Sequence, residues 1–191
     1  MRRGILGGSF DPVHLGHLRA AGAAADRLRL AVVHFVPAGR QPFKRGRHHA
    51  GAADRAAMLE RAVAADRRFV LDRREVERGG PSYTVDTLRE IAAQYPDDPL
   101  FLLVGADAAR DLSEWHQARE IAGLATVVAM TRPGFEPVPD ELVTETIEVP
   151  PVDISATLVR ERVARGESIA DLVPEEVARY IDSHGLYRIE D

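Results

Sequence analysis

Two histidines near the start of the chain, His14 and His17, are the residues whose types and spacing are best suited to chemistry. They follow Gly7 and Gly8, where the absence of Cβ atoms lets backbone N–H groups approach a bulky anion. A helix that begins near His14 places both imidazoles on one face, because residues three apart in a helix are neighbours. The stretch therefore predicts a turn that holds phosphate, with two ring donors beside it.

Three other interpretations of this stretch stay open from the residues alone. Two histidines can ligate zinc, although a catalytic zinc site needs a third protein ligand and the chain has no cysteine. Ser9 could be a nucleophile, but Gly-Gly-Ser is not the Gly-x-Ser-x-Gly elbow of a hydrolase, and no base has a matching spacing. A purely structural turn would account for the glycines at 7 and 8, yet it leaves Gly16 and both histidines without a role.

The stretch from Gly7 to His17 resembles the signature of the His-x-Gly-His nucleotidyltransferase superfamily, whose members transfer a nucleotidyl group from a nucleoside triphosphate to a phosphate acceptor. Residues 154–160 read Ile-Ser-Ala-Thr-Leu-Val-Arg and resemble the motif Ile-Ser-Ser-Thr-x-Ile-Arg of the pyridine-nucleotide branch. Pro-Ser-Tyr-Thr at 81–84, Gly-Ala-Asp at 105–107 and Trp115 are similar to segments of bacterial nicotinate-mononucleotide adenylyltransferases. Together these matches span most of the chain.

The resemblance implies adenylyl transfer from ATP to nicotinate mononucleotide, giving nicotinate adenine dinucleotide and pyrophosphate in NAD biosynthesis. Mg²⁺ is then expected to arrive on the ATP phosphates, with no metal site made by the protein. A phosphate acceptor is already ionised at neutral pH, so direct in-line attack needs no general base. Nicotinamide mononucleotide and phosphopantetheine are alternative acceptors, and a regulatory protein that binds nucleotide without turnover is the alternative from another functional class.

The resemblance also implies roles for individual residues. His14 and His17 would hold the transferring phosphate, and Lys44 and Arg160 would hold the outgoing pyrophosphate. ATP would further contact both motifs and the Gly-Ala-Asp segment, through Gly7, Gly8, Ser9, Phe10, Gly105, Asp107, Ile154, Ser155 and Thr157. The acceptor would lie against Tyr83, Thr84, Trp115 and Arg132, with its ring stacked on the sole tryptophan.

The sequence departs from the family pattern at two places. Ala156 stands where the second motif usually has a serine, which removes one hydroxyl that could contact phosphate. Pro42 and Phe43 precede Lys44, where the family commonly shows Pro-Pro-His-Lys. Structural roles also remain open for two of the candidates, because Asp107 can cap a helix and Trp115 can pack in the core.

Apolar runs that alternate with amphipathic segments must position these residues. Strands are predicted at 4–6, 31–37, 69–71, 100–104, 126–130 and 147–149. Helices are predicted from about 14 to 25, 54 to 65, 84 to 95 and 174 to 183, with shorter ones after 107 and from Ser155, whereas the charged segment 72–80 predicts a loop. His34 is expected to be a hydrogen-bonded core residue.

This alternation predicts an α/β fold: a doubly wound, mainly parallel sheet with helices on both faces, Rossmann-like. One domain would cover 1–191, with the C-terminal helical part from about 155 packed on it. Most of the candidate residues come just after predicted strands, and ligands bind at that edge of such a sheet. These are Gly7 to His17, Lys44, Gly105 with Asp107, Arg132, and Ser155 to Arg160. Independent stretches therefore converge on one site.

Composition narrows the functional classes. The 191 residues, 45% of them hydrophobic, fit one globular domain. With 25 Lys and Arg against 30 Asp and Glu, the formal charge of −5 gives no overall field that would attract nucleic acid or an anionic membrane. No apolar stretch approaches membrane-spanning length. Met1-Arg2-Arg3 leads into a predicted strand and a glycine turn, whereas a signal peptide needs a continuous apolar segment, so we expect no signal peptide there. We expect a cytoplasmic enzyme, and the sequence leaves open whether it forms a homo-oligomer.

Overall fold

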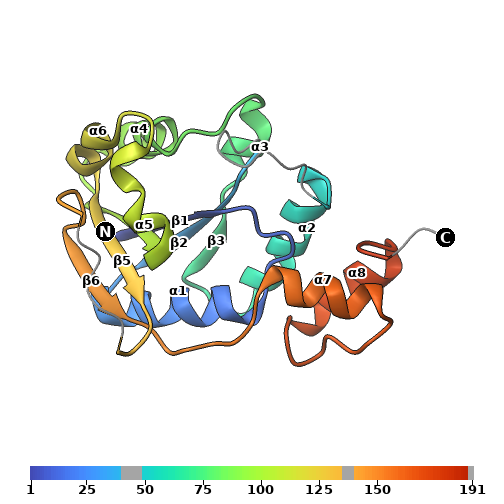
Figure 1. Ribbon diagram of the computed structural model, residues 1–191. Helices are drawn as coiled ribbons and strands as arrows, with labels where there is room; N and C mark the ends of the chain where they lie inside the picture. Colours follow the sequence, from blue (N-terminus) through green and yellow to red (C-terminus); the bar gives the residue numbers. More distant parts are fainter. Residues whose placement is uncertain (40–48, 135–139, 189–191) are drawn as a thin grey trace.

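Six parallel strands form one sheet in the computed structural model, which describes residues 1–39, 49–134 and 140–188 (Figure 1). The strand order is β3-β2-β1-β4-β5-β6. The strands are β1 Arg3–Gly8, β2 Val32–Pro37, β3 Phe69–Leu71, β4 Leu100–Gly105, β5 Thr126–Thr131 and β6 Glu145–Glu148. The predicted α/β class and parallel sheet are confirmed.

The order of the strands reverses at β1. From β1 the chain moves outward through β2 and β3 on one side, then returns to β4 on the other and continues to β5 and β6. Ile5 pairs with His34 of β2 and with Leu102 of β4, so β1 lies between them. In open α/β sheets the reversal leaves a crevice at the carboxyl ends of the two central strands, where ligands bind. Here these are the ends of β1 and β4.

Eight α-helices and one short 3₁₀ helix are found in the described residues. They are α1 Leu15–Leu28, α2 Ala52–Val63, α3 Arg74–Arg78, α4 Thr84–Gln94, α5 Ala106–Arg110, α6 Ala118–Leu124, α7 Ala156–Ala164 and α8 Glu175–Ser183, with the 3₁₀ helix at Leu112–Glu114. The C-terminal α8 lies against α2, where the Tyr180 hydroxyl donates to Asp54 Oδ1 at 3.0 Å (Figure 1). No helix of the described chain is both long and apolar enough to cross a membrane.

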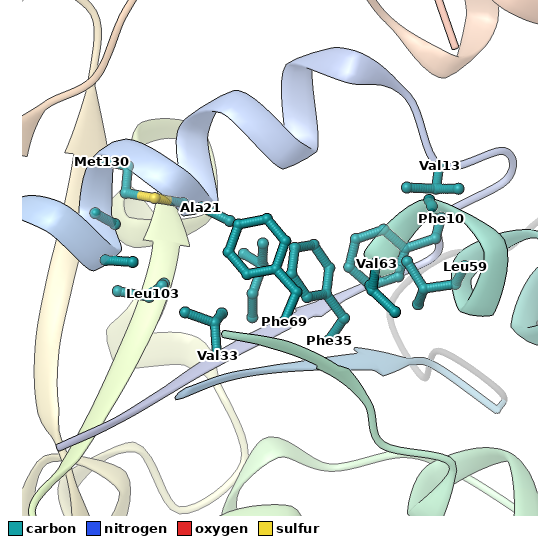
Figure 2. Packing of buried hydrophobic residues seen from close by; sticks show 14 of the residues in the cluster. Phe10, Val13, Ala21, Val33, Phe35, Leu59, Val63, Phe69, Leu103 and Met130 are labelled. Atoms are coloured by element: carbon teal, nitrogen blue, oxygen red, sulfur yellow. The ribbon is translucent and has the colours of Figure 1, made fainter. Parts of the chain in front are cut away.

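Two hydrophobic cores cover the two faces of the sheet, because successive side chains of a strand point to opposite faces. Leu6 and Leu103 point to the core under α1 and α2, whereas Ile5 and Leu102 point to the core under α4 and α6. Figure 2 shows the first core, in which the ring of Phe35 lies among other buried side chains of the cluster. Continuous apolar strands are what burial on both faces requires.

The predicted strands are confirmed to within two residues, but the segment 72–80 is not all loop. Residues 74–78 form α3, because Glu75 points inward and is anchored there. Its carboxylate Oε1 accepts a hydrogen bond from the Thr87 hydroxyl of α4 at 2.7 Å, while Arg74 Nε donates to Asp72 Oδ1 at 2.8 Å. The prediction for His34 is confirmed, since its ring is buried between Arg3 and Asp72.

The end of α1 and the capping residues of two other helices are further details of the helices. Helix α1 continues three residues past Ala25 and ends where Arg29 adopts a left-handed backbone conformation (φ 52°), because the buried Leu28 still packs on the core. The cap of α4 is Tyr83, and Thr84 is already inside the helix. Likewise Gly105 occupies the N-cap position of α5, so Asp107 lies in the first turn and does not cap it.

Candidate active site

The turn between β1 and α1 forms the centre of the site. Phe10 adopts a left-handed conformation (φ 47°) and inserts its ring into the core, where 1% of the residue is exposed. A Cβ on Gly8 would lie 3.2 Å from that ring, so a glycine fits best there. A Cβ on Gly7 would meet nothing within 4 Å, which leaves open space above the backbone of the turn. The Phe10 side chain therefore packs in the core beneath the turn, and only the Phe10 backbone can face a ligand.

His14 and His17 are brought together as their spacing predicts. Their rings stack with centroids 3.7 Å apart, and the edge of the Phe10 ring packs against His17. The backbone N–H of His14 donates to Nδ1 of His17 at 3.2 Å. Because Nδ1 accepts this bond, the neutral His17 ring carries its proton on Nε2. This nitrogen is therefore a hydrogen-bond donor for a ligand.

Burial keeps both rings neutral in the ligand-free protein. Desolvation lowers the pKa of His14 from 6.5 to about 4. Desolvation, together with the neighbouring His14, lowers the pKa of His17 from 6.5 to about 3. Nδ1 of His14 is buried and has no hydrogen-bond partner in the described part of the chain. Buried polar atoms are rarely left unpaired, so this nitrogen is a candidate for contact with a ligand.

Gly16 has a steric role that the sequence did not reveal. A Cβ at this position would lie 2.9 Å from Nδ1 and 3.0 Å from Cε1 of His14. Any other residue would force the His14 ring out of its present position. The glycine between the two histidines therefore permits the stacked arrangement.

The second motif reaches the same turn from the far end of the sequence. Ser155 caps α7 by accepting a hydrogen bond from the N–H of Leu158 at 3.1 Å, as predicted. One turn later, Arg160 Nη1 donates to the carbonyl oxygen of Asp11 at 2.7 Å, and Nη2 donates to Thr157 Oγ1 at 3.0 Å. The guanidinium is thus fixed beside the histidine turn.

A cavity of about 480 Å³ opens at the carboxyl ends of β1 and β4, where the strand order reverses. It is lined by the predicted residues Gly7, Gly8, Tyr83, Thr84, Gly105 and Trp115. The Tyr83 ring also packs against the His116 ring, with centroids 4.5 Å apart. The cavity that Tyr83 and Trp115 line is therefore also bounded by Gly7 and Gly8 of the phosphate turn. The cavity volume is in the range of small-molecule pockets.

Other predicted residues lie farther from this cavity. Asp107 is fully exposed and 3.5 Å from Arg110, and Arg132 pairs at 3.5 Å with Asp153 on the surface. Neither Asp107 nor Arg132 is among the described residues that line the cavity. Ile154 is half-buried and packs on the core under α1. Lys44 lies outside the described residues. No group of three or more potential metal ligands occurs in the described ranges.

Sequence reasoning missed three buried polar residues at the site: Asp11, Arg55 and Glu75. Glu75 lines the cavity, and burial raises the pKa of its carboxyl. Arg55 has no exposed surface and donates to the carbonyl of Ser9 at 2.7 Å and to that of Ala38 at 2.8 Å. Its position gave a signal, since a helix places it on the same apolar face as the residues three and four later, Met58 and Leu59.

Comparison with known proteins agrees with this geometry. The model of the cytidylyltransferase-like family matches residues 5–162. A "probable nicotinate-nucleotide adenylyltransferase" of Thermus thermophilus is 47% identical over 188 residues, which cover 98% of this chain and 100% of the relative. The chain belongs to the cytidylyltransferase-like family, among its nicotinate-nucleotide adenylyltransferases. A second family member of that name, from Geobacillus thermodenitrificans, is 45% identical over 96% of this chain and 85% of its own length.

Solved structures show the same fold at lower identity. The Plasmodium falciparum nicotinic acid mononucleotide adenylyltransferase complexed with NaAD matches with a TM-score of 0.76 and 18% identity over 97% of both chains. The same enzyme complexed with APC gives a TM-score of 0.75. The family membership confirms the resemblance drawn from the two motifs, and the stacked histidines and Arg160 are the parts of those motifs that meet in space.

Proposed function

We propose that this chain transfers the adenylyl group of ATP to the phosphate of nicotinate mononucleotide and releases pyrophosphate. The observation that carries the proposal is that Gly7 and Gly8 belong both to the turn beside the histidines and to the cavity lined by Trp115. A triphosphate on the turn and an aromatic mononucleotide in the cavity would then meet over these glycines. The names of the relatives, at 45 and 47% identity over nearly the whole chain, support the same activity.

The reaction is a single in-line displacement. An oxygen of the acceptor phosphate forms a bond to the α-phosphorus of ATP, and the bond from that phosphorus to the bridging oxygen of the β-phosphate breaks. The electron pair of the broken bond leaves with pyrophosphate, and no proton has to be removed from the ionised acceptor. Catalysis therefore depends on positioning the two phosphates and on stabilising charge as it develops.

The protein supplies donors for that charge. Nε2–H of His17 is oriented by the bond that its Nδ1 accepts, and His14 offers a buried nitrogen that lacks a partner among the described residues. We assign both rings to the transferring phosphate. Arg160 would contact the outgoing pyrophosphate, where a guanidinium can form paired hydrogen bonds with phosphate oxygens. Lys44 stays a predicted second ligand for pyrophosphate, and Mg²⁺ would enter with ATP as part of the substrate.

The acceptor half of the proposal assigns the cavity to the mononucleotide. The ring of Trp115 is half-buried and faces the cavity, so it can stack on a flat ring. Backbone N–H groups at the start of α4, next to Tyr83 and Thr84, favour a negatively charged group such as the nicotinate carboxylate. We further propose that residues 1–191 act as one domain. A cytoplasmic location belongs to the same proposal, because ATP is supplied there.

A panel of acceptors tests the proposed function. Purified protein would be incubated with Mg-ATP and, in separate reactions, nicotinate mononucleotide, nicotinamide mononucleotide or phosphopantetheine, and released pyrophosphate would be measured. We expect fastest release with nicotinate mononucleotide and a product with the mass of nicotinate adenine dinucleotide. Fastest release with phosphopantetheine would refute the acceptor assignment but leave adenylyl transfer in place. No release with any acceptor would favour a binding protein without turnover.

A further inference from the structure

The C-terminal segment after α8 is tied directly to the phosphate turn. The hydroxyl of Tyr187 donates a hydrogen bond to Oδ1 of Asp11 at 2.7 Å, across 176 residues of sequence. Asp11 is 5% exposed, and Tyr187 is half-buried against the core under α1. Burial and the neighbouring Asp11 carboxylate raise the pKa of Tyr187 far above its usual value, so the phenol stays protonated and remains a donor.

Asp11 connects three other parts of the molecule. The backbone N–H groups of His49 and Ala50 donate to its carboxylate at 2.7 and 3.1 Å. Its carbonyl oxygen accepts the hydrogen bond from Arg160 Nη1 at 2.7 Å. One residue therefore joins the C-terminal segment through Tyr187, the residues before α2, and the guanidinium assigned to pyrophosphate. A shift of the Asp11 backbone would move Arg160 with it.

The same turn is also held by a buried side chain of α2. Arg55 of α2 donates to the carbonyl of Ser9, two residues before Asp11. Ser9 and Asp11 flank Phe10, whose ring packs against His17. The residues on either side of Phe10 are therefore held by two side-chain anchors from elsewhere in the chain, Arg55 at Ser9 and Tyr187 at Asp11, in addition to the backbone contacts of Asp11. Only the second anchor can be removed by deleting a single hydroxyl group.

We propose that Tyr187 is a positioning residue for ATP: through Asp11 it holds the phosphate turn and Arg160 in the arrangement that binds the triphosphate. The inference rests on the proposed function, because ATP is the ligand that the turn would bind. The aromatic wall of the acceptor cavity comes from Tyr83 and Trp115, and neither Asp11 nor Tyr187 is among the described residues that line this cavity. Loss of the anchor should therefore weaken ATP binding selectively.

The test compares Tyr187→Phe with Tyr180→Phe. Tyr180 is a matched control because its hydroxyl also donates to a carboxylate, that of Asp54 at 3.0 Å, and also ties the C-terminal region to the rest of the chain. Asp54 lies on α2 and forms no side-chain hydrogen bond with the turn within the described residues, so the control removes a similar bond elsewhere. The KM values for ATP and nicotinate mononucleotide, kcat, the melting temperature and the calorimetric Kd for ATP would be measured for both variants.

We expect Tyr187→Phe to raise the KM and Kd for ATP about tenfold, the loss that one hydrogen bond to a charged group can cause. The KM for nicotinate mononucleotide should stay within about twofold, and Tyr180→Phe should change neither KM. A purely structural role for Tyr187 would lower the melting temperature and kcat of both variants alike and leave the ATP affinity unchanged, which would overturn the inference.

The two proposals can fail separately. If the wild-type protein binds ATP but transfers no adenylyl group, the proposed function fails, and the calorimetric Kd values still decide the role of Tyr187. If transfer occurs and Tyr187→Phe binds ATP as tightly as the wild type, the inference alone is refuted. Wild-type protein that binds no ATP would refute both.

Discussion

Acidification from pH 7.5 to 5.0 should destabilise the ligand-free protein, and His14 should account for much of the loss. The pKa of His14 is about 4 in the folded protein against 6.5 in an unfolded chain. Between pH 4 and 6.5, His14 binds a proton in the unfolded chain but not in the folded protein. The stability contributed by the neutral ring is therefore complete above pH 6.5 and falls as the pH decreases toward 4.

The size of the effect follows from the two pKa values. His14 is 7% exposed, so solvent screens its charge little. Between pH 7.5 and 5.0, the difference in proton binding at this one group lowers the free energy of unfolding by about 2 kcal/mol. The pKa of His17 is lowered in the same direction, so the wild-type loss should be larger than this figure.

Urea unfolding at pH 7.5 and 5.0 measures the loss directly. His14→Gln removes the titrating ring, so the difference between the two pH values should shrink by about 2 kcal/mol relative to the wild type. His184→Gln is the control, because it removes an exposed imidazole at the end of α8. If His14→Gln loses as much stability on acidification as the wild type does, the ring is not held neutral by burial and the electrostatic description of the site is wrong.

Three further substitutions test individual contacts. His17→Ala should lower kcat by at least ~10²-fold with the fold intact, since it deletes a donor to charge that develops in the transition state; a native circular dichroism spectrum together with a near-normal rate would refute the role. Gly16→Ala should leave the melting temperature nearly unchanged, because the higher helix propensity of Ala relative to Gly, worth up to about 1 kcal/mol, offsets the crowding by the added Cβ. It should nonetheless reduce kcat/KM for ATP, since its Cβ would displace the ring of His14. Trp115→Ala should raise the KM for nicotinate mononucleotide roughly tenfold to a hundredfold, the equivalent of ~1–3 kcal/mol of stacking. If the KM for ATP rises as much, Trp115 has a packing role.

The elements that carry the site were predictable because their sequence signals are local. β4, with its run from Leu100 to Val104, is buried on both faces, and continuous apolar runs of that kind predict parallel strands. The spacing of His14 and His17 predicts two rings on one face, and the structure stacks them. The carboxyl ends of β1 and β4 could be expected to meet once the chain was taken as doubly wound.

The residues that hold the site together were not predictable in this way. Asp11 forms hydrogen bonds with partners that are 38, 39 and 176 residues away in the sequence, and no local sequence pattern links residues so far apart. Segment 74–78 was expected to be a loop because its charges suggested exposure, but Glu75 turns inward to Thr87. The missed helix and the missed contacts of Asp11 have the same cause, which is that these buried polar side chains are placed by tertiary partners and not by periodicity. Arg55 differs, because its place on the apolar face of α2 follows from the helical spacing to Met58 and Leu59.

The central claim is that the acceptor phosphate attacks the α-phosphorus of ATP directly while His14 and His17 donate hydrogen bonds and form no covalent bond. The stereochemistry at phosphorus tests this claim. ATP carrying sulfur in one configuration at the α-phosphorus would be used as donor with nicotinate mononucleotide, and the configuration of the thio-dinucleotide product would be determined. A single in-line displacement predicts inversion. Retention would mean two displacements through an adenylylated side chain, and it would contradict the assignment of the histidines as donors.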